Sequence, residues 1–135
     1  MNARTWLNRA RTIERELSTL NEARQIINDQ LTSATQTLTG DVVQSSKDPH
    51  KFDQIGELAL TIKLRTMELD RVKAEILRGV NRVPDGLCRI VLIERYLNGK
   101  SMEKLADDNN ISRRNVWRIH GRAILQMEDV LNGRQ

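Results

Sequence analysis

A segment near the C-terminus that is rich in arginine and free of acids carries the clearest chemistry in the sequence. Between Asn109 and Met127 there is no aspartate or glutamate, although acids and bases are interleaved through most of the chain. The segment holds four arginines: Arg113, Arg114, Arg118 and Arg122. Guanidinium groups bind phosphates and guanine edges because their planar N–H forks match paired acceptors. The segment therefore concentrates positive charge near the C-terminus, and the net charge of +4 permits a nucleic-acid partner.

The residues around these arginines predict two short helices joined by a tight turn. Ser101 and Ser112 are suited to cap them, because a serine hydroxyl accepts bonds from the free N–H groups of a first helical turn. Asn110 lies between them, and asparagine is the usual stand-in for glycine at positive φ. Small or apolar residues occupy the positions where the helices would touch: Ala106, Ile111, Val116 and Ile119. This pattern is typical of a helix-turn-helix, whose second helix enters the major groove of DNA.

The same helical geometry predicts which side chains face outward. If Val116 and Ile119 face the core, the outward residues near the start of the second helix are Arg113, Arg114, Trp117 and Arg118. On composition alone an arginine-rich helix is a solvated face, and its combination with the turn spacing favours DNA binding. For Trp117, stacking on DNA and packing at the domain rim both stay open. We expect His120 to pack between helices rather than to bind a phosphate, and Arg122 to contact phosphate or support the helix internally.

An apolar segment before this pair is expected to support it. Pro84 suits a first helical position with Asp85 in the first turn, and Leu87 to Leu97 follows as an apolar helix. Asn98-Gly99 then ends that helix. The C-terminal domain is therefore expected to span residues 84–132.

Two apolar seams with heptad spacing predict an antiparallel coiled-coil hairpin over residues 3–80. A polar stretch from Gln44 to Lys51 separates the seams and indicates the connector. The seam positions are Trp6, Ala10, Ile13, Leu17, Leu20, Ile27, Leu31, Ala34 and Leu38, then Ile55, Leu58, Ile62, Leu69, Val72 and Ile76. The expected fold class is thus all-α, with this hairpin followed by the helix-turn-helix domain.

Two basic residues interrupt the seams of this hairpin. A turn centred near Ser45 would bring Arg24 and Arg65 to about the same level. We expect them to extend outward along the apolar surface or to pair with Glu22 and Glu68.

A second apolar stripe lies on the face of the second long helix opposite its seam. It consists of Leu60, Leu64 and Met67. Contact with another chain, as in a homo-oligomer, and packing on the C-terminal domain are equally compatible with this stripe.

The C-terminal residues resemble region 4 of bacterial sigma factors, the part that reads promoter DNA. The similarity rests on Val91-Leu92, Arg95-Tyr96-Leu97, Gly99-Lys100-Ser101, Leu105-Ala106, Ile111-Ser112-Arg113, Val116, Ile119 and Arg122-Ala123-Ile124-Leu125. The whole chain, including Gly40 to Ser46, further resembles a family of small phage and prophage proteins from Gram-positive bacteria. These are sigma-like or late-gene transcriptional regulators of the ArpU and RinA type.

This resemblance implies a sequence-specific regulator that binds double-stranded DNA and activates promoters with RNA polymerase in the cytoplasm of a bacterial host. Arg113, Arg114 and Arg118 fall where base-reading side chains sit. Trp117 falls where sigma factors usually place a basic phosphate contact. The full set of expected DNA contacts is Lys100, Ser112, Arg113, Arg114, Asn115, Trp117, Arg118 and Arg122.

The residues for catalysis are sparse. The chain has two widely separated histidines, a single cysteine and no glycine-rich phosphate loop. We therefore expect neither an enzyme nor a cofactor or metal site, and Cys88 is expected to be a small buried residue. No stretch approaches the ~18 apolar residues that a membrane-spanning helix needs.

Two alternative functions stay open. One is a DNA-recognition subunit of phage DNA packaging, similar to small terminase subunits, although their DNA-binding domain normally comes first. The other is a sigma-like interaction module that binds RNA polymerase without DNA.

Overall fold

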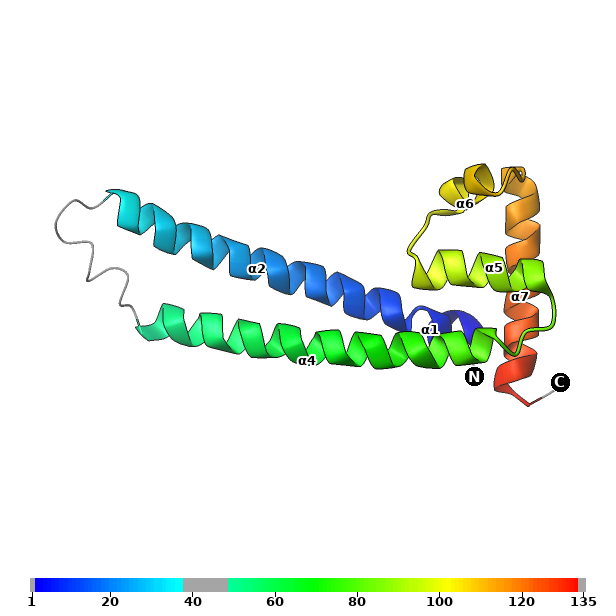
Figure 1. Ribbon diagram of the computed structural model, residues 1–135, viewed down its shortest axis with the longest axis horizontal. Coiled ribbons are helices and arrows are strands. Elements are labelled where there is room, and N and C mark those ends of the chain that lie inside the picture. Colours follow the sequence, from blue (N-terminus) through cyan, green and yellow to red (C-terminus); the bar gives the residue numbers. More distant parts are fainter. Residues whose placement is uncertain (1, 38–48, 134–135) are drawn as a thin grey trace. The chain divides into compact units, whose positions relative to one another are not determined.

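The computed structural model describes residues 2–37 and 49–133, with side chains for 2–32 and 50–133. These residues form helices and contain no strand, so the predicted all-α class is confirmed. The elements are α1 (Ala3–Leu7), α2 (Arg9–Thr37), α4 (Pro49–Val80), α5 (Gly86–Leu92), the π-helical η1 (Ile93–Leu97), α6 (Met102–Asp108) and α7 (Arg113–Leu131) (Figure 1). No helix within the described part is long and apolar enough to cross a membrane.

The chain divides into two compact units, and the division cuts through both long helices. The first unit combines Met1–Thr12 with Leu69–Gln135, and the second is Ile13–Glu68. This differs from the expected boundary at residues 80–84. The reason is that α1, the first turn of α2 and the end of α4 contribute buried residues to the core that the C-terminal helices share: Ala3, Leu7, Ala10, Val72, Ile76 and Val80.

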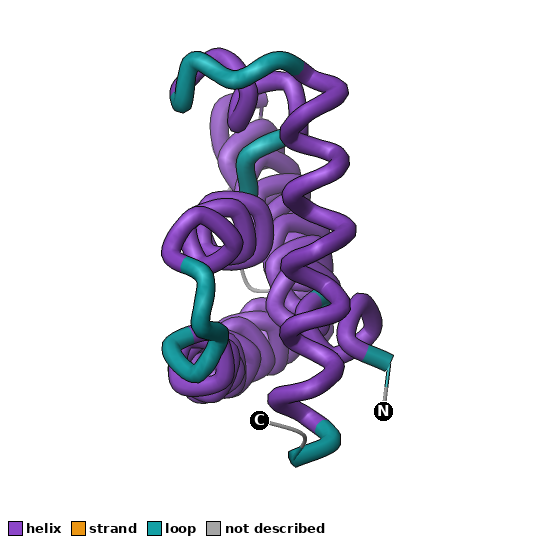
Figure 2. Tube along the Cα trace, turned by 90° about the vertical axis from the view of Figure 1, so that its right-hand side faces the viewer, coloured by secondary structure: helices purple, strands orange, loops and turns teal. Residues whose placement is uncertain are grey.

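Helix α7 is the element on which the first unit is built. α1, α5 and α6 all pack against it, with α6 beside its start and α5 crossing it further along (Figure 2). Its buried side chains recur in steps of three and four: Val116, Ile119, His120, Ala123, Ile124, Met127 and Val130. Burying one large aliphatic side chain stabilises a fold by about 1.5–3 kcal/mol, so this stripe fixes which face of α7 points outward.

The end of α4 is packed too closely for a side chain at Gly79. A Cβ atom there would lie 2.8 Å from Trp6 Cη2 and 2.8 Å from Met127 Cε. The indole is itself held, because the Arg9 guanidinium lies 4.9 Å from the centroid of the Trp6 ring. The glycine therefore permits the close approach of three segments that are far apart in the sequence.

The second unit contains stretches of α2 and α4 that lie side by side (Figure 1). Arg65 Nε donates to Glu16 Oε1 at 2.7 Å, and its Nη1 lies 3.4 Å from Glu68 Oε2. The expected pairing of Arg65 with Glu68 is thus present. The prediction that Arg24 and Arg65 lie at the same level is wrong, because Arg65 lies beside Glu16 instead. Arg24 donates to Asn21 of its own helix at 2.9 Å.

The seam between these stretches is less buried than the heptad pattern predicts. Among its described residues in this unit only Ile13 is buried, and the rest are half-buried: Leu17, Leu20, Ile27, Leu31, Ile55, Leu58 and Ile62. The physical reason is an open groove of about 750 Å³, whose lining includes Ala23, Ile27, Gln54 and Leu58. The two helices therefore do not interdigitate along the whole seam.

Part of the expected connector is helical. α4 begins at Pro49, so His50 and Lys51 belong to this helix rather than to a loop. A proline is tolerated in a first helical turn because its missing N–H has no partner there. The rest of the expected connector, Gln44 to Asp48, lies outside the described residues, as do the segment Gly40 to Ser46 and the seam position Leu38.

The Gly79 contact makes a prediction about stability. We expect Gly79→Ala to destabilise the protein by about 1–3 kcal/mol, because the methyl group overpacks against the indole. Gly56, also within α4, has no atom within 4 Å of a Cβ position. Gly56→Ala should therefore stabilise by about 0.5–1 kcal/mol through helix propensity alone. Urea unfolding measures both, and a stabilising effect of both substitutions would contradict the close packing at Gly79.

Candidate nucleic-acid interface

The caps of α6 and α7 form as predicted. Ser101 Oγ accepts a hydrogen bond from the Lys104 N–H at 3.1 Å. Ser112 Oγ accepts one from the Asn115 N–H at 3.2 Å. Each cap satisfies an N–H that the helix itself leaves unpaired, so the two starting points are fixed by local chemistry.

The turn between the two helices is closed by backbone geometry. Asn110 has φ of 53°, in the left-handed region, as predicted from its position between the two helices. The Ile111 N–H donates to the Ala106 carbonyl at 3.0 Å, and Ala106 is buried. A small residue at position 106 and a left-handed residue at 110 together allow α7 to leave α6 within a few residues.

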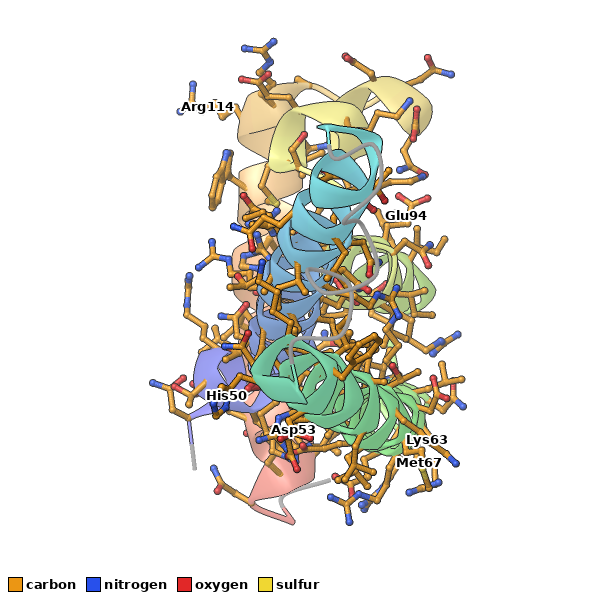
Figure 3. The ribbon with its side chains drawn as sticks, turned by 90° about the vertical axis from the view of Figure 1, so that its left-hand side faces the viewer. His50, Asp53, Lys63, Met67, Glu94 and Arg114 are labelled. Atoms are coloured by element: carbon orange, nitrogen blue, oxygen red, sulfur yellow. The ribbon has the colours of Figure 1, made fainter. Side chains whose placement is uncertain are left out.

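A network of charged and polar side chains stabilises the turn between α6 and α7. Lys100 Nζ lies 3.2 Å from Glu94 Oε1 and 2.8 Å from Asp108 Oδ2. Glu94, labelled in Figure 3, also accepts a bond at 2.7 Å from Asn109 Nδ2. Hydrogen bonds to Asp108 and Glu94 raise the pKa of Lys100. Lys100, which we expected to contact DNA, is therefore held between two carboxylates that join η1 to α6.

Arg122 is also held within the protein. Its Nη2 lies 3.2 Å from Asp85 Oδ2. Asp85 caps α5, and its Oδ1 accepts the Leu87 N–H at 2.9 Å, which lowers the pKa of Asp85 together with the charge of Arg122. The expected role of Pro84 as first helical residue is wrong, because α5 begins at Gly86 after this cap. Of the two roles expected for Arg122, internal support is the one seen here.

The start of α7 presents an exposed basic face. Val116 and Ile119 are buried, and the residues predicted to face outward are exposed: Arg113, Arg114, Trp117 and Arg118. Arg114 projects from the ribbon into solvent (Figure 3). A shallow depression of about 390 Å³ is lined by Ser112, Arg114, Asn115 and Arg118. The structure thus brings four of the expected contacts together on one surface.

The arginines of this face differ in their partners. Arg113 Nη1 lies 3.5 Å from Glu103 Oε1, and both side chains are exposed. Arg118 Nη2 donates to Asn115 Oδ1 at 2.7 Å, which orients the guanidinium without neutralising it. Within the described part of the chain, neither Arg114 nor Arg118 forms an ion pair with a carboxylate. Among the arginines of this face, Arg114 and Arg118 therefore have guanidinium groups that are available to bind an external anion.

Behind this face lies a buried aromatic pair. His120 is 3% exposed, and its Nε2 lies 2.8 Å from Tyr96 Oη. Burial, with the charges of Arg4 and Arg95, lowers the pKa of His120 to about 4, so the imidazole is neutral at pH 7. Trp117 is 56% exposed, and its ring meets that of His120 edge-on at 5.9 Å. His120 therefore packs between helices, while Trp117 both packs on it and stays accessible.

The remaining candidates lie apart from this face. Leu60, Leu64 and Met67 are 51%, 52% and 59% exposed in the second unit. Figure 3 shows Met67 and Lys63 projecting from α4 on the side away from α2. Cys88 is buried, as predicted. The described residues hold no group of three His, Cys, Asp or Glu side chains suited to a metal ion.

Sequence reasoning missed one group of basic residues. Arg4, Arg11 and Arg95 line a pocket together with Trp117 and His120. No sequence signal could have joined them, because they come from separate segments that only the fold brings together.

Comparison of the chain with protein-family models, with curated proteins and with solved structures found no match. Its function is therefore inferred from the residues and their geometry.

The lowered pKa of His120 predicts a pH dependence of stability. The ordinary pKa of histidine is 6.5, and that of His120 in the folded protein is about 4. At pH values between these two, His120 is protonated in the unfolded chain and neutral in the folded protein. The contribution of neutral His120 is therefore complete above pH 6.5 and is lost as pH falls through about 4. His120→Gln should remove this part of the pH dependence of the free energy of unfolding.

The measurement is chemical unfolding of both proteins at several pH values from 7.5 downward. A constant difference in stability between wild type and His120→Gln across this range would contradict a neutral, buried imidazole.

Proposed function

We propose that this chain is a sequence-specific DNA-binding transcription regulator. In this proposal α6, the turn at Asn110 and α7 form a helix-turn-helix like region 4 of sigma factors, and the start of α7 enters the major groove. The observation that carries it is the exposed face of Arg114, Trp117 and Arg118, which is free of acids and is presented by a helix whose opposite face is buried. A major groove admits one α-helix, and its base edges are the acceptors that guanidinium forks match.

Arg114 and Arg118 are the proposed base readers. They are four residues apart, so they share one side of α7, and neither pairs with a carboxylate among the described residues. Asn115 holds Arg118 in one orientation, which lowers the entropy lost when the fork binds two acceptors. Ser112 accepts a bond in its cap and keeps its own hydroxyl proton, which can be donated to a phosphate.

The other basic residues take supporting roles in this proposal. Arg113 faces an exposed acid at 3.5 Å and contacts the DNA backbone after that weak pair opens. Lys100 braces the turn, and Arg122 braces α5 against α7. Trp117 is placed to pack on sugars or thymine methyl groups beside the readers.

The second unit is proposed as the protein-contact element. In this view α2 and α4 form an antiparallel hairpin, and the exposed stripe of Leu60, Leu64 and Met67 contacts a second copy of the chain. A two-fold assembly would present two α7 helices to a symmetric DNA site. The family resemblance extends the proposal to a phage or prophage activator of the ArpU and RinA type, working with RNA polymerase in the bacterial cytoplasm.

The first test asks whether α7 reads sequence. Selection from a random duplex library yields the preferred site, and the protein is then titrated with that site and a scrambled duplex at one salt concentration. We expect Arg118→Ala to weaken specific binding by about tenfold or more, because one bidentate pair discriminates by about 1–3 kcal/mol. Binding to the scrambled duplex should barely change. Arg71→Ala, at an exposed position in α4, removes the same charge elsewhere and should leave the specificity ratio unchanged.

The possible results separate the proposed function from its alternatives. Equal losses on both duplexes would make Arg118 a phosphate anchor rather than a reader. Absence of any DNA affinity, combined with binding to RNA polymerase, would favour the interaction module. A ring-shaped assembly that binds a packaging motor would favour the DNA-packaging alternative.

A separate test addresses the stripe on α4. Leu64→Glu should shift an oligomer toward monomer in sedimentation equilibrium, because it places a charge in an apolar contact. Ala59→Glu adds the same charge at an exposed position of α4 outside the stripe and should leave the oligomer intact. Unchanged helical content in circular dichroism shows that both variants fold. A wild-type protein that stays monomeric at high concentration would refute the contact.

A further inference from the structure

Three arginines from distant parts of the sequence surround one small pocket in the first unit. The pocket has a volume of about 120 Å³. Arg4 lies in α1, Arg11 in the first turn of α2 and Arg95 in η1. The other lining residues are Asn8, Tyr96, Met102, Trp117 and His120. None of the lining residues is acidic, so the positive charge is not balanced inside the pocket.

These positive charges are close enough to affect one another. Burial and the nearby charge of Arg11 lower the pKa of Arg95. Arg95 Nη1 donates to the Lys100 carbonyl at 2.9 Å, which holds this guanidinium in place. In the described part of the chain, Arg4 and Arg11 form no ion pair with a carboxylate. Grouping cations without a counter-charge costs free energy, and an anion in the pocket would recover it.

A buried nitrogen gives an independent indication of a ligand. His120 is 3% exposed, and its Nδ1 has no hydrogen-bond partner among the described residues. Its Nε2 lies 2.8 Å from Tyr96 Oη. When the tyrosine hydroxyl donates to Nε2, the proton of the neutral ring lies on Nδ1, which becomes a donor without an acceptor. Buried donors are normally paired, so this N–H lacks the acceptor that an oxyanion supplies.

The size and lining of the pocket indicate what it can hold. Its volume of about 120 Å³ leaves room for a tetrahedral oxyanion. Donors from three guanidinium groups and one imidazole suit a group with three or four oxygens in different directions, as in phosphate, better than a planar carboxylate.

We propose that this pocket binds a single phosphate group, with the sugar-phosphate backbone of DNA as its source. The choice of DNA rests on the proposed function, since Trp117 lines the pocket and is exposed on the same helix as Arg114 and Arg118. A backbone phosphate held here would fix the register of α7 in the groove, because phosphate contacts position a protein and base contacts specify its site. Free inorganic phosphate is the other source of the same chemistry.

The first arm of the test uses the full-length protein and inorganic phosphate without DNA. The ring nitrogens of His120 are followed by NMR at pH 7 during titration, against sodium chloride at matched ionic strength. We expect a saturable change that Arg4→Gln weakens by about tenfold, as expected for loss of one charge-assisted contact. Arg4 is exposed, so this variant should keep its fold, and Arg71→Gln should bind phosphate like the wild type.

The second arm uses the selected DNA site with single methylphosphonate substitutions, each of which removes the charge of one phosphate. At one phosphate of the DNA site, the substitution should weaken binding of the wild-type protein by about tenfold. The same substitution should leave DNA binding by Arg11→Gln unchanged, because that variant has already lost the contact with this phosphate. Arg71→Gln should remain sensitive at that position.

The outcomes of the two arms decide different questions. Coupling between one phosphate and Arg11 supports the proposal with DNA as the source. Saturable binding of inorganic phosphate without such coupling supports the pocket with free phosphate as its ligand. Absence of both overturns the pocket, even if DNA binds. Absence of DNA binding overturns the proposed function, and the inorganic phosphate titration then decides the pocket alone.

Discussion

The burial of one face of α7 is the constraint on which the rest of the first unit depends. Val116, Ile119, Ala123 and Met127 all lie in the core, and α1, α5 and α6 pack on the helix that carries them. With 3.6 residues per turn, this fixes the direction of every other side chain on α7. At the start of α7 the outward face therefore carries Arg113, Arg114 and Arg118, and the sequence has no acid between Asn109 and Met127.

The ends of the supporting helices show how that face is held in place. Polar side chains form caps and ion pairs at each junction, as Ser112 does at the start of α7 and Lys100 does between Glu94 and Asp108. Basic residues of the domain therefore divide into those that hold the protein together and those that stay available to a partner. Arg122 belongs to the first group, through its contact with Asp85.

Much of the local structure could be predicted from the sequence because its causes are local. Serine caps, a left-handed asparagine and periodic apolar residues act within a few positions of one another, and the caps at Ser101 and Ser112 and the φ of Asn110 were predicted on that basis. Long-range pairings were not predictable in this way. The register that pairs Arg65 with Glu16, the capture of Lys100 and the gathering of Arg4, Arg11 and Arg95 arise only from tertiary packing.

The central claim, that the start of α7 lies in the major groove, is tested most directly by methylation interference on the selected DNA site. Dimethyl sulfate methylates guanine N7 in the major groove and adenine N3 in the minor groove, so one reagent samples both. Guanidinium forks bond O6 and N7 of guanine, and the account predicts interference at guanines inside the site with adenines unaffected. Interference confined to adenines, or binding that tolerates methylation at every guanine, would contradict it.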